Sequence, residues 1–392
     1  MSGVERTRID TERNFLDILD KVHEIKDETI DTTHVFPLSQ VYEGLLLKMG
    51  EKGNDGGQFF TPRELIRIMV EAINPQIGQT VYDPACGTGG FLAQAFEQMA
   101  GPNNANITSP DQLETLKHRT FYGREKDNVI YPIALSNLVL HQVDEPHLWH
   151  GNTLTGAETY GGLFTNAPSL YDIVLTNPPF GGKEGKDAQT RFAYKTGATQ
   201  VLFLQHVIDS LKAGGKCRIV CDEGVLFRTN ETAFVQTKRK LLDDCDVWCI
   251  LSLPSGTFVN AGAGVKTNMV FFTKGQTTEK IWYYDLADIK VGKKSPLTRS
   301  HFDEFFRLLP TRADSDHSWT VTRQEIEAKN YDLKAVNPHA KNDEDTRTPE
   351  ELLDLIETKG REVAEALAVL RARQSSQLKL TPEDNVDSHD QW

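Results

Sequence analysis

The stretch Thr80-Val81-Tyr82-Asp83-Pro84-Ala85-Cys86-Gly87-Thr88-Gly89-Gly90-Phe91 decides the fold class of this chain. Its first four residues have the character of a buried strand, the middle is a glycine-rich turn, and Phe91–Met99 has the pattern of a helix. A strand, a glycine-rich turn and a helix in this order form the nucleotide-binding corner of a doubly wound, Rossmann-like α/β sheet. The dinucleotide-binding pattern is excluded, because Leu92 stands where that pattern has its last glycine.

Asp83 stands at the entrance of this turn. A carboxylate at that position would repel a pyrophosphate and would favour a cationic group, such as an α-ammonium. The corner is therefore predicted to bind a ligand that carries a positive charge.

A second strand ends in an unusual turn, Tyr171-Asp172-Ile173-Val174-Leu175-Thr176-Asn177-Pro178-Pro179-Phe180. Proline cannot continue a sheet ladder, so the strand must stop before Pro178. The turn then offers carbonyl oxygens, the Asn177 amide and the aromatic face of Phe180. Acceptors beside a stacking surface suit a planar ring with an exocyclic amino group. On these four residues alone, a strand-ending turn with a core Phe is an equally good interpretation.

The rest of the chain continues an alternation of helices and strands, which favours a doubly wound α/β fold. We expect helices over Asn128–His141 and Thr199–Lys212, and strands over Phe121–Glu125, Leu148–Leu154, Cys217–Cys221, Trp248–Leu253, Lys266–Lys274 and Ile281–Tyr284. Residues 101–118 are predicted to be a surface excursion. Thr61–Glu64 has the pattern of a capping box with Pro62 at the first helical position, which predicts a helix reaching about Ala72.

Composition sets further bounds. A chain of 392 residues can hold one large α/β domain with additions, or two domains. The sequence contains no run of 18 apolar residues, so no membrane span is expected. The N-terminus has no signal-peptide core. Five cysteines, an odd number, favour a reducing compartment. The pairs Cys217/Cys221 and Cys245/Cys249 lie in strand-like runs without nearby His, so we expect buried thiols rather than zinc ligands.

The net charge of −13 is unusual for a free-standing DNA-binding protein, which is usually basic. The acidity is not confined to the C-terminal tail, where residues 341–392 hold 7 Lys and Arg against 13 Asp and Glu. Either the substrate is not nucleic acid, or the positive surface is local, or a partner supplies the DNA contact. The loop after Phe180 is locally basic, with Lys183, Lys186, Arg191 and Lys195, and is either a solvated loop or a lid that closes on a DNA backbone.

The two ends of the chain differ from its middle. We predict an N-terminal helical segment at 1–54, a catalytic domain at 55–336 and an acidic C-terminal tail at 337–392. Thr348–Glu351 is a capping box for a helix in that tail. This helix carries a narrow heptad seam that could fold back on its own domain or pair with another subunit. The seam positions are Leu353, Ile356, Gly360, Val363, Leu367 and Leu370.

Several motifs together resemble one known family. Asn177–Phe180 is similar to the catalytic motif of amino-methyltransferases that modify adenine N6 in DNA, and Asp83–Phe91 is similar to their S-adenosylmethionine (SAM) binding motif. Phe59-Phe60-Thr61-Pro62 and Leu253–Phe258 resemble further motifs of the same family, in the same order. The best match is the modification (M) subunit of type I restriction–modification systems, over residues 55–335.

The resemblance implies a set of site residues. The catalytic residues would be Asn177, Pro178, Pro179 and Phe180, and Phe258 would be a second aromatic wall of the base pocket. Glu125, or Asp127 as the alternative, would take the ribose hydroxyls of SAM. Asn152 would accept a bond from the SAM adenine, although the family usually has Asp there. The full cofactor set implied is Phe60, Thr61, Pro62, Asp83, Ala85, Cys86, Gly87, Thr88, Gly89, Gly90, Phe91, Glu125, Asn152, Thr153, Leu154 and Asn177.

The function implied by the resemblance is methyl transfer from SAM to N6 of a flipped-out adenine, in the cytoplasm and without a metal. DNA and a separate specificity subunit are the implied partners, and a second M subunit and a restriction subunit are optional ones. The short segment before Phe59 departs from the family, whose members usually carry a longer helical domain there. A protein-glutamine or RNA amino-methyltransferase, and a SAM-binding structural or regulatory subunit without turnover, remain as alternatives.

Overall fold

A computed structural model describes residues 61–258, 266–292, 295–334, 336–339 and 348–378, together with Leu16. The expectations for the N-terminal helical segment and for Phe60 lie outside the described residues. The chain divides into two compact units, Met1–His339 and Ala340–Trp392, which are described separately. The domain boundaries expected after residues 54 and 336 stay predictions.

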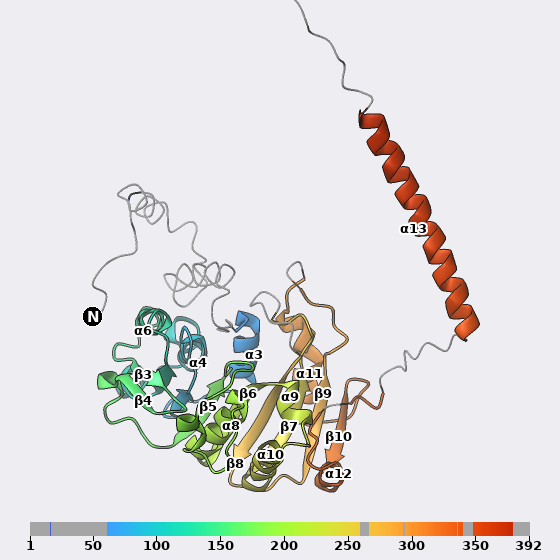
Figure 1. The fold of residues 1–392 in the computed structure, drawn as a ribbon. Coiled ribbons are helices and arrows are strands. Elements are labelled where there is room, and N and C mark those ends of the chain that lie inside the picture. The colour runs from blue at the N-terminus through green and yellow to red at the C-terminus, as the bar shows by residue number, and fades with distance from the viewer. Residues whose placement is uncertain are drawn as a thin grey trace, which may run out of the picture. The chain divides into compact units, whose positions relative to one another are not determined.

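The first unit is built on a ten-stranded sheet with the order β10-β9-β7-β8-β6-β5-β1-β2-β3-β4 (Figure 1). The strands are β1 (Val81–Asp83), β2 (Phe121–Glu125), β3 (His147–Asn152), β4 (Ala157–Tyr160), β5 (Tyr171–Thr176), β6 (Leu211–Asp222), β7 (Cys245–Ser252), β8 (Thr267–Lys274), β9 (Lys280–Asp285) and β10 (Ser318–Thr322). Strands β3, β2, β1, β5 and β6 run parallel, and β8 lies antiparallel between β6 and β7.

The strand order reverses at β1, which pairs in parallel with β2 on one side and with β5 on the other. In a doubly wound sheet, such a switch point opens a crevice at the carboxyl ends of the two central strands. The predicted fold class is confirmed. The edge at which such a crevice is expected lies between Asp83, which ends β1, and the turn that follows β5.

Helices cover both faces of this sheet (Figure 1). In the first unit they are α3 (Arg63–Ile73), α4 (Gly90–Ala100), α5 (Pro110–His118), α6 (Ile130–Leu140), α7 (Lys186–Gln189), α8 (Thr199–Ser210), α9 (Glu223–Phe227), α10 (Thr232–Asp244), α11 (Asp303–Leu308) and α12 (Arg323–Ala328). Short 3-10 turns lie at η2 (Pro102–Asn104), η3 (Gly162–Phe164) and η5 (Arg299–Phe302).

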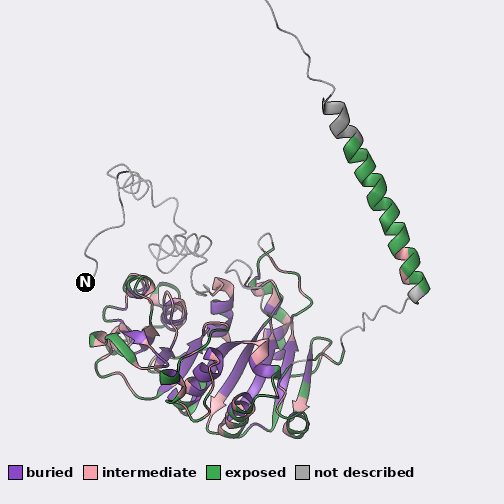
Figure 2. Ribbon diagram, viewed as in Figure 1, coloured by how far each residue is buried: buried purple, intermediate pink, exposed green. Residues whose placement is uncertain are grey.

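Alternating side chains of the buried strands supply two separate cores. In β5, Ile173 and Leu175 face the core formed with α3, α4, α6 and α11, whereas Val174 faces the core formed with α8, α10 and α12. A strand has a side-chain period of two, so a strand buried on both faces reads as a continuous apolar run. In Figure 2 the central strands of the sheet are coloured mostly as buried.

Three expectations for the elements were wrong. Residues 101–118 are not a plain excursion, because Ser109 accepts a bond from the Gln112 N–H and begins α5. Helix α8 ends at Ser210, and β6 starts at Leu211 rather than at Cys217. The capping box at Thr61 does not form, because α3 starts at Arg63 with Pro62 as its N-cap residue and no side chain caps it.

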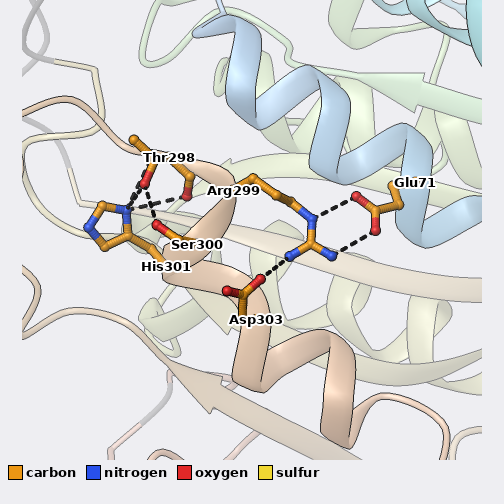
Figure 3. A network of polar contacts seen from close by, with 6 residues as sticks. All are labelled: Glu71, Thr298, Arg299, Ser300, His301 and Asp303. Atoms are coloured by element: carbon orange, nitrogen blue, oxygen red, sulfur yellow. Dashed lines mark hydrogen bonds and ion pairs between the residues drawn. The ribbon is translucent and has the colours of Figure 1, made fainter.

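The C-terminal end of α3 is joined to η5 by a salt-bridge network (Figure 3). Arg299 donates two 2.8 Å bonds to the Glu71 carboxylate and a third, also 2.8 Å, to Asp303. Its guanidinium carbon lies 3.9 Å from the ring centroid of Phe306. A bidentate pair stacked on a ring holds a fixed geometry better than an ordinary surface ion pair. This network ties two segments that are 228 residues apart in the chain.

The second unit contains α13 (Pro349–Leu378). The predicted helix is confirmed, and its seam is exposed along the described part, with Leu353 at 61%, Ile356 at 66% and Leu370 at 59% of their full accessible areas. Figure 2 shows this exposure along the helix. Among the described residues, neither this helix nor any other is both long and apolar enough to cross a membrane.

Replacing Arg299 tests the network. We expect Arg299→Ala to lower the free energy of unfolding by about 1–2 kcal/mol, a modest value because both partners are more than a third exposed to solvent. The corresponding fall in Tm is about 2–5 °C, measured by calorimetry.

Arg307→Ala is the matched control, because Arg307 lies in the adjoining helix α11 and makes one exposed bond to Glu304. We expect its effect on the free energy of unfolding to stay within about 0.5 kcal/mol. Equal losses for the two variants would contradict a specific role for Arg299.

Candidate active site

The glycine-rich turn between β1 and α4 is held from two sides. Gly87 (φ 53°) and Gly89 (φ 78°) adopt left-handed conformations, which side chains other than glycine rarely adopt. The Cys86 N–H donates to the Arg124 carbonyl at the end of β2, and the Thr88 carbonyl accepts from the Asn137 side chain in α6. Gly89 is the N-cap residue of α4, so the first N–H groups of that helix follow the glycine-rich turn directly, and a helix N-terminus suits an anionic group.

Asp83 lies at the end of β1 with only 1% of its surface exposed. Its Oδ1 accepts bonds from the Ala85 N–H (3.0 Å) and the Thr176 hydroxyl (2.7 Å). Its Oδ2 is buried and has no hydrogen-bond partner among the described residues. Burial raises the pKa of Asp83 to about 7, against the lowering effect of those two bonds and with a smaller upward contribution from Glu125. A bound cation would give the Oδ2 of this buried carboxylate a partner.

Glu125 ends β2 beside the glycine-rich turn. One carboxylate oxygen accepts from the Gly87 N–H (3.0 Å), and the other accepts from the N–H groups of Lys126 (2.8 Å) and Asp127 (2.9 Å). Burial raises its pKa, and these three bonds act in the opposite direction. An ionised carboxylate has about four acceptor positions. One remains for a further donor, such as a hydroxyl group.

The end of β3 reaches the same edge of the sheet. The Thr153 hydroxyl donates to the Pro84 carbonyl over 2.7 Å. Asn152 uses its side-chain oxygen locally, where it accepts from the N–H groups of Leu154 (2.9 Å) and Thr155 (3.2 Å). A carbonyl-type oxygen has two lone pairs, so both are used in this turn. Acceptance of a ligand amino group by Asn152 would require one of these bonds to be exchanged.

The turn after β5 presents two acceptors with different supports. The Asn177 side-chain nitrogen donates to the Thr61 hydroxyl oxygen over 3.0 Å, and the Asn177 Oδ1 is buried without a partner among the described residues. The Pro178 carbonyl accepts a 3.3 Å bond from the side-chain nitrogen of Gln200 in α8. Since a carbonyl oxygen has two lone pairs, one remains for another donor.

The ring of Phe180 packs against a buried aromatic side chain, that of Phe258. Its ring is half-buried and meets Phe258 edge-to-face, with the centroids 5.1 Å apart and the planes at 81°. Phe258 is 1% exposed and belongs to the core. It therefore supports Phe180, and its expected role as a second wall of a base pocket stays a prediction.

The structure thus brings most of the predicted site residues to one edge of the sheet. Hydrogen bonds join Thr61 with Asn177, Asp83 with Thr176, Gly87 with Glu125, and Pro84 with Thr153. The side chains of Cys86 and Phe91 are buried in the core instead, so only their main chains could meet a ligand. All five cysteines are free and buried, as expected for structural thiols.

Three supporting residues were not predicted from the sequence: Thr176, Asn137 and Gln200. Thr176 precedes Asn177 directly, and its place at the end of the strand could have indicated a role at the crevice. Asn137 and Gln200 lie within apolar helices, where no local pattern distinguishes a core amide from one that supports a site. Among the described residues, no group of three or more His, Cys, Asp or Glu could hold a metal ion.

Known proteins resemble this chain in sequence and in fold. A family model described as N-6 DNA methylase matches residues 34–347. The methylase subunit of the type I restriction enzyme EcoEI of Escherichia coli is 33% identical over 90% of this chain and 72% of its own length. The EcoKI methylase subunit of E. coli K12 is 35% identical over 74% of this chain and 59% of its own length.

A solved chain from a study of assembly in a type I restriction–modification system superposes with a TM-score of 0.74. It is 35% identical, and the alignment covers 96% of this chain and 78% of the other. The resemblance inferred from the motifs is confirmed: this chain belongs to the N-6 DNA methylase family, together with the methylase subunits of type I restriction enzymes.

Proposed function

We propose that this chain is the catalytic subunit of a DNA methyltransferase that transfers a methyl group from SAM to N6 of adenine. The observation that carries the proposal is the pair of acceptors after β5, the Asn177 Oδ1 and the Pro178 carbonyl, on the same edge of the sheet as the unsatisfied Asp83 carboxylate. An exocyclic amino group has two N–H donors and matches two acceptors.

The residues around the glycine-rich turn fit SAM. The Oδ2 of Asp83 is a buried acceptor with no partner among the residues that the structure describes, and it suits the α-ammonium of SAM. The remaining acceptor position of Glu125 suits a ribose hydroxyl. The N-terminus of α4 suits the cofactor's carboxylate. When bound, SAM supplies an electrophilic methyl group on a sulfonium, which is already a good leaving group.

The chain's own residues orient the other reactant. Adenine must leave the duplex, because its N6 atom cannot be reached inside the stack. Phe180 stacks on the extruded base. The Asn177 Oδ1 and the Pro178 carbonyl accept the two N6 hydrogens, which draws the nitrogen lone pair out of ring conjugation and directs it at the methyl group. The N6 lone pair positioned in this way would take the methyl group that bound SAM would supply, with the sulfur leaving as a thioether and the surplus N6 proton passing to water. Catalysis is then mainly orientation and polar stabilisation.

The net charge and the exposed helix seam of this chain are consistent with a partner subunit that helps to bind DNA. The net charge of −13 disfavours unaided DNA binding, and a separate specificity subunit would supply sequence recognition. The exposed seam of α13 is a surface on which a helix of such a subunit could pack. The basic loop after Phe180 is a candidate lid on the DNA backbone. Because this chain spans only 59% of the EcoKI subunit, contacts made by the rest of that subunit are not assigned to it.

Removing the Asn177 amide tests the proposed reaction. We expect Asn177→Ala to bind SAM within about threefold of the wild-type affinity and to lose methyl transfer by at least about a hundredfold, because one of the two N6 acceptors is gone. Calorimetric titration gives the affinity, and transfer of labelled methyl groups to unmethylated duplex DNA gives the rate. Full activity in this variant would refute the assignment of the acceptor turn.

Asp83 predicts a pH dependence of cofactor binding. Its pKa of about 7 means that most of the carboxyl is protonated at pH 5.5 and about half is ionised at pH 7. A cation binds the ionised form, so the affinity for SAM is expected to rise about tenfold from pH 5.5 to 7. The range stops at pH 7, because an α-amino group itself begins to lose its proton above that.

Two controls isolate this carboxyl. Asp83→Asn is expected to weaken SAM binding and to flatten the pH profile. Methylthioadenosine, which lacks the α-ammonium, is expected to bind the wild-type protein without the rise. A rise that persists in Asp83→Asn would exclude Asp83 as the group that binds the ammonium.

A further inference from the structure

The two acceptors of the proposed site are each fixed by one uncharged side chain that the reaction itself does not use. We propose that Thr61 and Gln200 are positioning residues: Thr61 anchors the Asn177 amide by its donor end, and Gln200 fixes the Pro178 carbonyl. This inference rests on the proposed function, because it explains how the acceptors are presented to an amino group.

The bond to Thr61 anchors the donor end of the Asn177 amide and leaves its acceptor end for a ligand. An amide has a donor end and an acceptor end, and turning it by 180° exchanges them. With Nδ2 donating to the Thr61 oxygen over 3.0 Å, the donor end is occupied and Oδ1 stays buried without a partner among the described residues. In the opposite direction, an N–H of Asn177 would meet an N–H of the substrate, and the two donors would repel.

The loss of the expected capping box supports this role for Thr61. A Thr followed three positions later by Glu usually caps the helix with its hydroxyl. Here Pro62 is the N-cap residue of α3 and no side chain caps that helix. The Thr61 oxygen instead accepts from a residue 116 positions away. A local use of this hydroxyl has been exchanged for a contact in the site.

The position of Thr61 depends on α3, which is held at its other end. Arg299 binds the Glu71 carboxylate through two nitrogens, and the buried Arg218 of β6 donates to the Ala72 carbonyl over 3.3 Å. A rigid helix held at its C-terminal turn keeps its N-terminal residues in place.

The neighbours of Gln200 fix the direction of its side-chain amide. Its Oε1 accepts a 2.8 Å bond from the Asp222 backbone N–H, which can only donate. Its Nε2 must therefore face the Pro178 carbonyl, to which it donates over 3.3 Å. Gln200 is 4% exposed, so loss of either bond would leave a buried polar group unsatisfied. Through Gln200, the acceptor turn after β5 is fixed to the carboxyl end of β6.

The test of Thr61 compares two substitutions. Thr61→Val keeps the shape but removes the hydroxyl, and Thr61→Ser keeps the hydroxyl. We expect Thr61→Val to lower the single-turnover rate at saturating SAM by about ten- to a hundredfold, with the Kd for SAM within about threefold of wild type. Thr61→Ser should recover the rate to within about threefold.

The same experiment separates this role from cofactor binding, which the sequence motif implied for Thr61. A raised Kd for SAM with an unchanged rate at saturation would mean that Thr61 only binds the cofactor. Equal losses in the Val and Ser variants would mean that packing, rather than the hydroxyl, is what matters. Either result overturns the proposal for Thr61.

Gln200→Glu tests the second contact, because a carboxylate still accepts from Asp222 but can no longer donate to Pro178. Its matched control is Gln205→Glu in the same helix, where Gln205 is also buried and makes the same two kinds of bond, with the backbone of Tyr194. We expect similar losses in Tm, but a fall in transfer rate at least about tenfold larger for Gln200→Glu. Equal falls in rate would overturn the proposal for Gln200.

Hydrogen exchange of the Asn177 amide can be measured without methyl transfer, so it tests the positioning contact separately from the proposed function. Asparagine is labelled with ¹⁵N for nuclear magnetic resonance, and the Asn177 signal is assigned from its absence in Asn177→Ala. We expect the side-chain amide of Asn177 to be protected from hydrogen exchange in wild type and in Thr61→Ser, but not in Thr61→Val. Unchanged protection in Thr61→Val would overturn the proposal. If the wild-type chain and its partner transferred no methyl group to DNA while protection followed this pattern, the proposed function would fail and the positioning contact would stand.

Discussion

The parallel pairing of β1 with β5 is the constraint on which the site depends. Val81 pairs with Ile173 and Tyr82 with Val174, so the two strands end side by side. The glycine-rich turn leaves one strand and the Asn-Pro-Pro-Phe turn leaves the other. Residues that are almost a hundred positions apart in sequence are then bonded directly, as Asp83 is to Thr176. A slip of one residue in this register would turn every side chain of β5 to the opposite face.

Within the described part of the chain, two buried acceptors of the site have no hydrogen-bond partner, the Oδ2 of Asp83 and the Oδ1 of Asn177. Folded proteins pair nearly all such atoms, and leaving one unpaired costs about 1–3 kcal/mol. Burial raises the pKa of Asp83 in the folded protein above its value in the unfolded chain. The folded, ligand-free protein therefore loses stability as pH rises from about 4 toward 7, because the buried carboxyl must give up its proton. A cationic cofactor and an amino group on the substrate are the partners that would satisfy these two atoms.

The sequence predicted the strands that carry the motifs well, because their apolar runs and the glycine or proline turns that end them are local signals. Phe121–Glu125 is a strand with these bounds, and β5 ends at Thr176, before Pro178 as expected. The helix α5 was missed although Ser109-Pro110 is a local start signal. The predicted capping box at Thr61 was wrong because α3 begins one residue later, with Pro62 as its N-cap residue, and the Thr61 oxygen accepts from Asn177 instead. Gln200 could not be predicted, since its role exists only once α8 lies between β6 and the acceptor turn.

The most direct test of the account is the identity of the methylated product. Labelled SAM is incubated with unmethylated duplex DNA, with and without the specificity subunit, and the DNA is digested to nucleosides. We expect N6-methyladenine, formed only when the partner is present. SAM binding without any methylated DNA in either case, together with label on a peptide or RNA offered in parallel, would contradict it.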